Sequence, residues 1–246
     1  MSSEENTPNS ADTSTETPTW GPMRSFGRIK SRTLKPRQAG LFDTLLPEIE
    51  ITDARIEAIN DGELDGATEL WLEIGFGGGE HLAGQAERNP QALILGFEPF
   101  LNGVGSLLRH VDERNLKNVR VLADDARPVI DRLKDASVDK VFVLFADPWP
   151  KARHHKRRFI QTETLDAFAR VLKDGGRLRF ATDWADYADW TLEKATAHAD
   201  FDWPAQSQTE WNTPPADHLT TRYEEKKLGD CAPVFLDFYR KARGGV

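Results

Sequence analysis

Short apolar runs alternate with stretches of helical periodicity between residues 70 and 197. The runs that we predict as strands cover residues 70–74, 93–97, 119–122, 141–145 and 177–182. We predict one helix after each strand. The first ends near residue 88, the second covers 102–114, the third is short and ends near 133, and the last two cover 162–172 and 185–197. Because strands that alternate with helices form parallel sheets covered on both faces, this pattern predicts a doubly wound α/β fold. The run 141–145 is the most apolar, and we predict it as a central strand.

Three further segments complete the expected organisation. Residues 1–19 contain acids but no Lys or Arg, and they offer almost nothing to bury, so we predict a disordered acidic tail. Residues 20–40 are basic without a single acid, and we predict an extended or partly ordered segment. Residues 41–246 then form one domain. It opens with a helix over about 41–59, and two late strands are expected near 220–224 and 234–239.

Composition limits the classes of function. The net charge is −8, but basic residues cluster in 20–40 and again in 151–158, so this acidic protein can still present two basic surfaces to a nucleic acid. Cys231 is the only cysteine, which excludes an internal disulfide and a cysteine-rich zinc site. No apolar run approaches the roughly 18 residues that span a bilayer, and no signal peptide is recognisable. These features predict a cytoplasmic protein without a membrane partner.

A glycine-rich loop follows the first predicted strand. The sequence from Glu73 to Glu80 places glycines at Gly75, Gly77 and Gly79, where backbone can approach a ligand closely. The dinucleotide fingerprint G-x-G-x-x-G requires its third glycine at position 80, which is Glu here. A carboxylate at that helix start would repel a pyrophosphate. The pattern acid-x-G-x-G-x-G instead resembles the first motif of class I methyltransferases, which bind S-adenosyl-L-methionine (SAM).

Acids end three successive strands. Glu73 suits the positive charge of SAM, and Glu98 can accept hydrogen bonds from both hydroxyls of an adenosine ribose. Asp125 follows the third strand and can accept from the adenine amine, although Asp124 is a near-equivalent alternative. Ligands of open α/β sheets bind at these carboxyl ends. The ribose contact alone does not separate SAM from NAD, because both carry an adenosine ribose. Together with the glycine pattern, the acids predict a SAM site here.

The central strand ends in a distinctive segment. Asp147 is followed by Pro148-Trp149-Pro150, and the basic block 151–158 comes directly after. The two prolines fix a non-helical exit from the strand. A carboxylate, a flat aromatic ring and phosphate-binding cations are what an enzyme that modifies a nucleic-acid base needs in one place.

This segment, Asp147 to Phe159, resembles the signature of the bacterial tRNA (guanine-N7-)-methyltransferases. The resemblance runs from about residue 40 to 241 and is supported by residues 73–77, Glu98, residues 181–183 and residues 221–224. It implies the seven-stranded, mostly parallel, Rossmann-like sheet of class I methyltransferases. It also implies SAM as methyl donor and tRNA as substrate, modified at the guanine in position 46 of the variable loop.

The resemblance also implies roles for individual residues. Asp147 is the implied active-site residue. The implied cofactor-binding residues are Glu73, Gly75, Gly77, Glu98, Asp125 and Asp147. The implied tRNA-contacting residues are Lys151, Arg153, Lys156, Arg157, Arg158, Asp183, Thr221, Arg222, Tyr223 and Glu224. The chain departs from the family at His155, where Asn is usual, at Tyr223, where Phe is frequent, and at Lys226-Lys227, where Arg-Gly is usual.

Three rival interpretations follow from the same residues. A Rossmann dehydrogenase lacks support because the third glycine is missing, and a non-catalytic RNA-binding protein would not need the strand-end acids. Methylation of another RNA stays open, because only the resemblance points to tRNA.

His154 and His155 lack a completing set of ligands, so we expect no metal. No obligate protein partner is evident.

Overall fold

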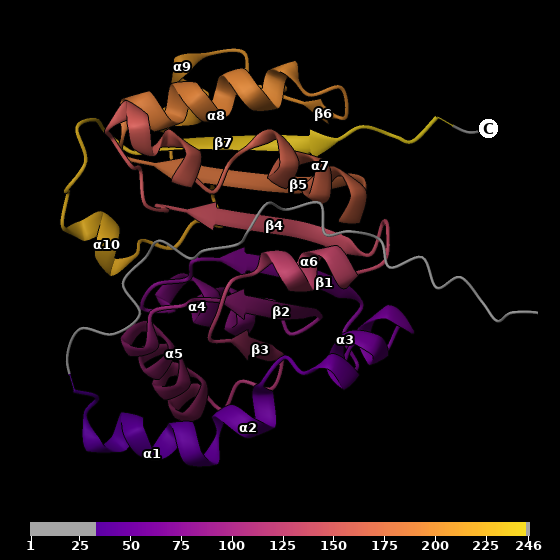
Figure 1. Cartoon of the computed structure of the whole chain (residues 1–246), viewed down its shortest axis with the longest axis vertical. Coiled ribbons are helices and arrows are strands. Elements are labelled where there is room, and N and C mark those ends of the chain that lie inside the picture. The colour runs from indigo at the N-terminus through magenta and orange to yellow at the C-terminus, as the bar shows by residue number, and fades with distance from the viewer. Residues whose placement is uncertain (1–32, 245–246) are drawn as a thin grey trace, which may run out of the picture.

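The computed structural model describes residues 33–244, which form a seven-stranded sheet in the order β3-β2-β1-β4-β5-β7-β6 (Figure 1). β1 to β5 run parallel, and β7 lies antiparallel to β5 and β6. The strands are β1 (Glu69–Ile74), β2 (Ala92–Phe97), β3 (Val119–Leu122), β4 (Val138–Leu144), β5 (Leu172–Thr182), β6 (Phe201–Asp202) and β7 (Val234–Arg240). The predicted doubly wound, class I methyltransferase-type sheet is confirmed.

Helices connect the strands and cover both faces of the sheet. They are α1 (Pro36–Thr44), α2 (Leu46–Ile49), α3 (Asp53–Asn60), α4 (Glu80–Arg88), α5 (Leu101–Arg114), α6 (Arg127–Arg132), the 3-10 helix η1 (Ala152–Arg157), α7 (Thr162–Val171), α8 (Ala185–Ala197), α9 (Gln208–Asn212) and α10 (Arg222–Glu225). The central position of β4, between β1 and β5, agrees with its apolar sequence.

The core has two layers because successive strand residues point to opposite faces. Leu70, Leu72 and Ile74 of β1 pack with α3, α6, α7 and α8. Trp71 points the other way and packs with α1, α4 and α5. Glu73 shares the side of Trp71, so its carboxylate is directed toward α4 rather than into the first layer.

The first predicted helix, 41–59, is wrong, because three helices occupy this region. The chain extends at Glu50 and Ile51, where the Ile51 N–H donates to the carbonyl of Val121 in β3. Thr52 then caps α3 by accepting from the N–H of Arg55. A pairing with a distant strand thus interrupts a locally helical pattern. α1 begins at Pro36, inside the predicted basic segment, while the predicted tail 1–19 and residues 20–32 lie outside the described residues.

The predicted strand at 220–224 is also wrong. Residues 222–225 form α10, and Thr221 and Glu224 cap it reciprocally in a capping box. The capping pattern, Thr221 followed three residues later by Glu224, was already present in the sequence. The short strand β6 was not predicted, and β5 begins at Leu172 rather than at 177.

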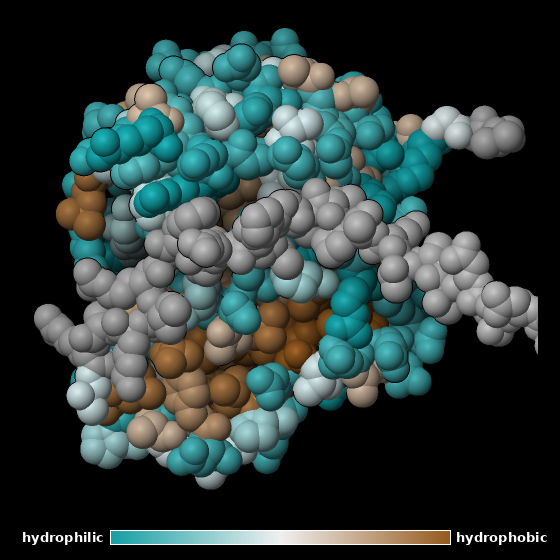
Figure 2. Space-filling view, viewed as in Figure 1, coloured by the Kyte–Doolittle hydropathy of each residue, from teal (hydrophilic) through white to brown (hydrophobic). Residues whose placement is uncertain are grey.

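The surface differs between the two halves of the view in Figure 2. Hydrophobic side chains gather in the lower half, over β2, β3 and α5, whereas the upper half over α7 and α8 is mostly hydrophilic. Within residues 33–244, no helix combines the length and the apolarity that spanning a bilayer requires.

Candidate active site

The chain leaves β1 and β4 at the point where the strand order reverses, which is where open α/β sheets bind ligands. In Figure 1 the arrowheads of β4 and β5 point toward the left edge, where α10 lies. The loop after β1 forms the floor of this region. Gly75, Gly77 and Gly79 all have positive φ, at 69°, 55° and 78°, in the left-handed region that glycine tolerates best. A Cβ on Gly75 or Gly77 would meet nothing within 4 Å, so these glycines border open space.

Gly103, near the start of α5, presses against the same loop. A Cβ there would lie 2.2 Å from the carbonyl oxygen of Gly77, so only glycine allows this approach. Sequence reasoning missed Gly103. Its position inside a predicted helix, where glycine is unfavourable, was the available signal.

Glu98 lies at the end of β2 and is buried. Its Oε2 accepts from the Gly77 N–H at 2.8 Å, and its Oε1 accepts from the Phe100 N–H at 2.9 Å. Burial raises the pKa of this carboxyl, the two backbone N–H groups oppose that rise, and the nearby charge of Asp147 adds to it. Glu98 therefore fixes the glycine loop, and each oxygen keeps a second lone pair for a ligand.

Glu73 is buried at the end of β1. His81 of α4 lies beside it, with its Nδ1 2.7 Å from Glu73 Oε2. His81 is equally buried and stacks edge-on against Phe142, with ring centroids 5.1 Å apart. One carboxylate oxygen is thus committed to an internal partner that the sequence did not indicate.

Asp125 follows β3 and is bound by its own neighbour in the chain. Arg127 donates from Nε to Oδ1 at 2.9 Å and from Nη2 to Oδ2 at 2.6 Å. Asp124 is exposed and accepts from the Asp125 N–H. Both acids therefore stand at the predicted strand end, and the choice between them as adenine contact stays open.

Asp147 is held by an unusual backbone. Phe145 and Trp149, on either side of it, have positive φ of 51° and 45°, a rare conformation for bulky residues that clusters at functional sites. Although Asp147 is exposed overall, neighbouring protein displaces water from its carboxyl and raises the pKa. The Tyr223 ring lies 6.1 Å from that of Phe145, and burial and then the charges of Asp183 and Asp147 raise the pKa of Tyr223. Asp147, Asp183 and Tyr223 therefore surround one region.

The basic block forms η1 directly after this turn. Lys151, Arg153 and Lys156 are exposed. Arg157 lies over the face of Trp149, with its guanidinium carbon 4.9 Å from the ring centroid, and His154 meets the same ring edge-on at 6.0 Å. The block thus presents cations to solvent and at the same time supports Trp149 beside Asp147.

Arg158 does not fit its predicted role as a phosphate contact, because it is 2% exposed. Its Nε donates to the carbonyl of Pro148 at 2.9 Å, and its Nη2 pairs with the carboxylate of Asp186. The guanidinium also lies over the rings of Tyr187 and Trp190, at 4.9 and 5.2 Å. Arg158 therefore anchors the Asp-Pro-Trp-Pro turn to α8 from inside the protein.

The other predicted tRNA-contacting residues, Asp183 and residues 221–224, lie at the same edge of the sheet. Arg222 is exposed and lies 3.4 Å from Glu80 at the start of α4. Glu224 is paired with buried His218, with Oε2 and Nε2 2.8 Å apart. Asp183 is buried at the end of β5, and its Oδ1 has no hydrogen-bond partner in the described structure. Thr221 is used for the cap of α10.

The sequence departure at Lys226-Lys227 is accommodated by the turn after α10. Lys227 adopts a positive φ of 49°. Gly229 then donates its N–H to Asp183 Oδ2 at 2.9 Å, and a Cβ on Gly229 would lie 1.9 Å from the Asp183 carbonyl oxygen. The turn therefore stays docked on the end of β5.

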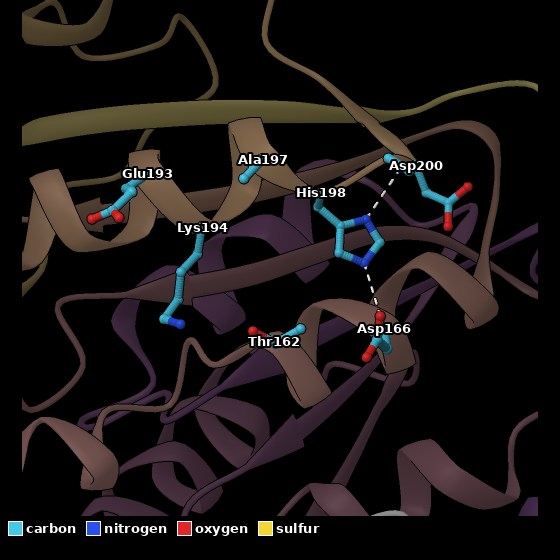
Figure 3. Close-up of a pocket in the computed structure, with 8 residues that line it drawn as sticks. Thr162, Asp166, Glu193, Lys194, Ala197, His198 and Asp200 are labelled. Carbon is cyan, nitrogen blue, oxygen red and sulfur yellow. Dashed lines mark hydrogen bonds and ion pairs between the residues drawn. The ribbon is translucent and has the colours of Figure 1, made fainter.

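A separate pocket, of about 480 Å³, lies away from these strand ends, between α7 and α8 (Figure 3). His198 spans it, with Nε2 3.0 Å from Asp166 Oδ1 and Nδ1 accepting from the Asp200 N–H. None of the predicted site residues lines this pocket. Among residues 33–244, no group of three or more His, Cys, Asp or Glu side chains could hold a metal ion.

Comparison with known proteins agrees with this geometry. A family model described as a putative methyltransferase matches residues 67–235. A tRNA (guanine-N(7)-)-methyltransferase of Caulobacter vibrioides is 59% identical over 220 residues, covering 89% of this chain and 96% of the relative. The chain belongs to the bacterial tRNA (guanine-N7-)-methyltransferase family. Another member, from Hyphomonas neptunium, is 49% identical over 88% of this chain and 99% of its own length.

Solved structures support the fold of this family. A 16S rRNA (adenine(1408)-N(1))-methyltransferase from Catenulisporales acidiphilia superposes with a TM-score of 0.52 at 14% identity. The superposition covers 79% of this chain and 95% of the other. A structure described as an antibiotic-related methyltransferase gives the same TM-score and identity over 80% of this chain and 95% of its own. At this level of identity the likeness concerns the class I methyltransferase fold alone.

Proposed function

We propose that this chain transfers a methyl group from SAM to N7 of a guanine in tRNA, the guanine at position 46 of the variable loop. The observation that carries this proposal is the placement of Asp147 in a strained turn between the glycine loop and an exposed cationic helix, in a chain of this family. The position within the tRNA rests on the family resemblance.

The residues at the strand ends suit SAM better than a nucleotide cofactor. SAM carries a positive sulfonium and an ammonium but no phosphate. The loop is faced by the carboxylates of Glu73 and Glu98. Open space beside Gly75 and Gly77 leaves room for a ligand against the backbone. In this proposal Glu98 holds the ribose, Glu73 faces the amino-acid portion, and Asp125 or Asp124 accepts from the adenine amine.

The reaction needs positioning more than proton transfer. When bound, SAM supplies an electrophilic methyl group, and guanine N7 supplies an in-plane lone pair without a proton to remove. The protein must therefore hold nucleophile and methyl group in line, and no general base is required. Asp147 lies where a carboxylate can accept from the N1–H and amine of a guanine and offset the positive charge that the ring gains. The unpartnered Oδ1 of Asp183 can accept beside it.

Exposed cations near Asp147 provide the proposed tRNA surface. Lys151, Arg153 and Lys156 can meet phosphates, and Arg157 holds Trp149 as a flat surface next to the base. Arg222 and Tyr223 border the same region from α10. Arg158 takes no part in this surface.

The test is transfer of labelled methyl from SAM to an unmodified tRNA transcript, followed by identification of the labelled nucleoside. We expect 7-methylguanosine, and we expect the label to disappear when the variable-loop guanine is replaced by adenine. Label in another nucleoside would overturn the reaction. Label that survives the replacement would overturn the position alone.

A further inference from the structure

One face of α4 contacts the segment 217–224, which contains two of the proposed tRNA-contacting residues, Arg222 and Tyr223. Positions four apart share a helix face, so Glu80 and Gly84 are neighbours, as are His81 and Gln85. Glu80 pairs with Arg222 at 3.4 Å. Gly84 lies so close to the side chain of Leu219 that a Cβ there would be 2.4 Å from Leu219 Cδ1.

The buried half of this face makes polar contacts. Gln85 donates from Nε2 to the carbonyl oxygen of Asp217 at 2.7 Å. The same Nε2 lies 3.2 Å from Nε2 of His81, and Nδ1 of His81 lies 2.7 Å from Glu73 Oε2. His81 and Gln85 are 1% and 2% exposed. An unbroken polar chain therefore runs from the carboxylate of Glu73, which the proposed function assigns to SAM, through two buried side chains to the backbone of the segment.

The Asp217 end of this chain is tied to the sheet by ion pairs. The Asp217 carboxylate accepts from Arg177 at 2.9 Å and from Arg179 at 2.6 Å, and Arg179 is also paired with Asp237 of β7. The next residue, His218, holds Glu224 of α10. A displacement of Glu73 would therefore be transmitted to α10, because hydrogen bonds and one peptide bond connect each of the intervening residues to the next.

We propose that His81 and Gln85 are positioning residues that couple SAM binding to tRNA binding. A ligand that fixes the Glu73 carboxylate also fixes the segment 217–224 through His81 and Gln85. The ligand that binds second then loses less conformational entropy, because the segment is already ordered. Because such coupling is reciprocal, tRNA must raise the affinity for the cofactor by the same factor. This inference rests on the proposed function, since it takes SAM and tRNA as the two ligands.

The experiment measures the dissociation constant of S-adenosylhomocysteine by calorimetry, with and without saturating unmodified tRNA. For the parent chain we expect tRNA to tighten this constant by at least about 5-fold. In Gln85→Leu the contact between Glu73 and His81 is kept but the link to Asp217 is lost, so this ratio should fall below about 2-fold. Gln91→Leu, the same change at an exposed position, should keep the parent ratio.

Leu219→Ala provides a second route to the same result, because it loosens the segment from Gly84 without burying an unpaired group. It should also reduce the ratio, and thermal unfolding confirms that each variant is folded. A parent ratio of one, or a parent ratio retained in Gln85→Leu, would overturn the proposal. Absence of methyl transfer to tRNA guanine by the parent in the same preparation would instead overturn the proposed function.

Discussion

The carboxylate of Glu98 accepts the backbone N–H of Gly77 at 2.8 Å, and this contact joins the end of β2 to the loop that follows β1. The same carboxylate accepts from Phe100, at the start of α5. One buried side chain thus sets the relative positions of a strand end, a glycine loop and a helix start. The proposed ribose contact uses the lone pairs that remain.

Replacing Glu98 tests this double role. In Glu98→Ala two backbone N–H groups lose their acceptor, and hydrogen bonds to a charged group contribute about 1.5–3 kcal/mol each. We expect S-adenosylhomocysteine affinity to fall at least about 10-fold and the melting temperature to decrease. Glu98→Gln keeps one acceptor oxygen and should lose less of both. Calorimetry and thermal unfolding measure the two effects, and full affinity in the alanine variant would contradict the assignment.

Asp147→Asn tests the proposed stabilisation of the methylated ring. The amide keeps the size of the side chain but removes its charge, so it cannot offset the positive charge that develops on guanine. We expect kcat to fall by about 100-fold or more, in the range of other preorganised electrostatic contacts. The KM for tRNA should change by only a few-fold. A kcat within 2-fold of the parent value would remove Asp147 from the reaction.

The protonation of Asp147 should also appear in the pH dependence of kcat. The pKa of Asp147 is raised by partial burial, so the charged form is lost at a pH above the ordinary value of about 4 as the solution is acidified. Activity should therefore be constant at neutral pH and decline on the acid side. The pKa of Glu98 is also raised, by burial first, so kcat/KM for SAM should decline in acid as well. In Asp147→Asn the decline of kcat should be absent while that of kcat/KM for SAM persists.

Arg158 and Lys156 make a matched pair within one basic block. Arg158→Ala leaves Asp186 and the Pro148 carbonyl without their buried partner, and breaking such a pair costs about 3–5 kcal/mol. The carboxylate of Asp186 is itself largely exposed, so the loss should lie at or below the lower end of that range. We expect a clearly lower melting temperature for Arg158→Ala. Lys156→Ala should melt like the parent but flatten the dependence of tRNA affinity on salt by about one unit of slope.

Gly103→Ala in α5 and Gly40→Ala in α1 compare the same substitution at a tightly packed and at an open helix position. At Gly103 the new methyl group would lie 2.2 Å from the Gly77 carbonyl, so the glycine loop must shift and SAM affinity should fall at least about 10-fold. At Gly40 nothing lies within 4 Å, and the helix should gain about 0.5–1 kcal/mol. Cofactor titration and thermal unfolding of the two variants test the pair. Equal cofactor affinity in both would show that Gly103 does not shape the loop.

The features that depend on local spacing were predictable from the sequence. Alternating apolar runs predicted β1 to β5, and the position of an acid at the end of a parallel strand was enough to bring Glu73, Glu98 and Asp147 to one edge. The reason is geometric, since the carboxyl ends of parallel strands necessarily meet there. The basic residues between 151 and 158 likewise predicted the positive charge of η1.

Contacts between residues far apart in the chain depend on the assembled fold and were not predictable from the sequence. Arg158 looks like its neighbours in sequence, yet packing against α8 buries it. Residues 220–224 were predicted as a strand, yet residues 222–225 form a helix that Thr221 and Glu224 cap. The polar chain through His81 and Gln85 had no sequence signal, because its partners Glu73 and Asp217 meet only when the sheet and α4 are assembled. A linear pattern encodes periodicity and local turns, whereas burial and pairing follow from which surfaces the fold brings together.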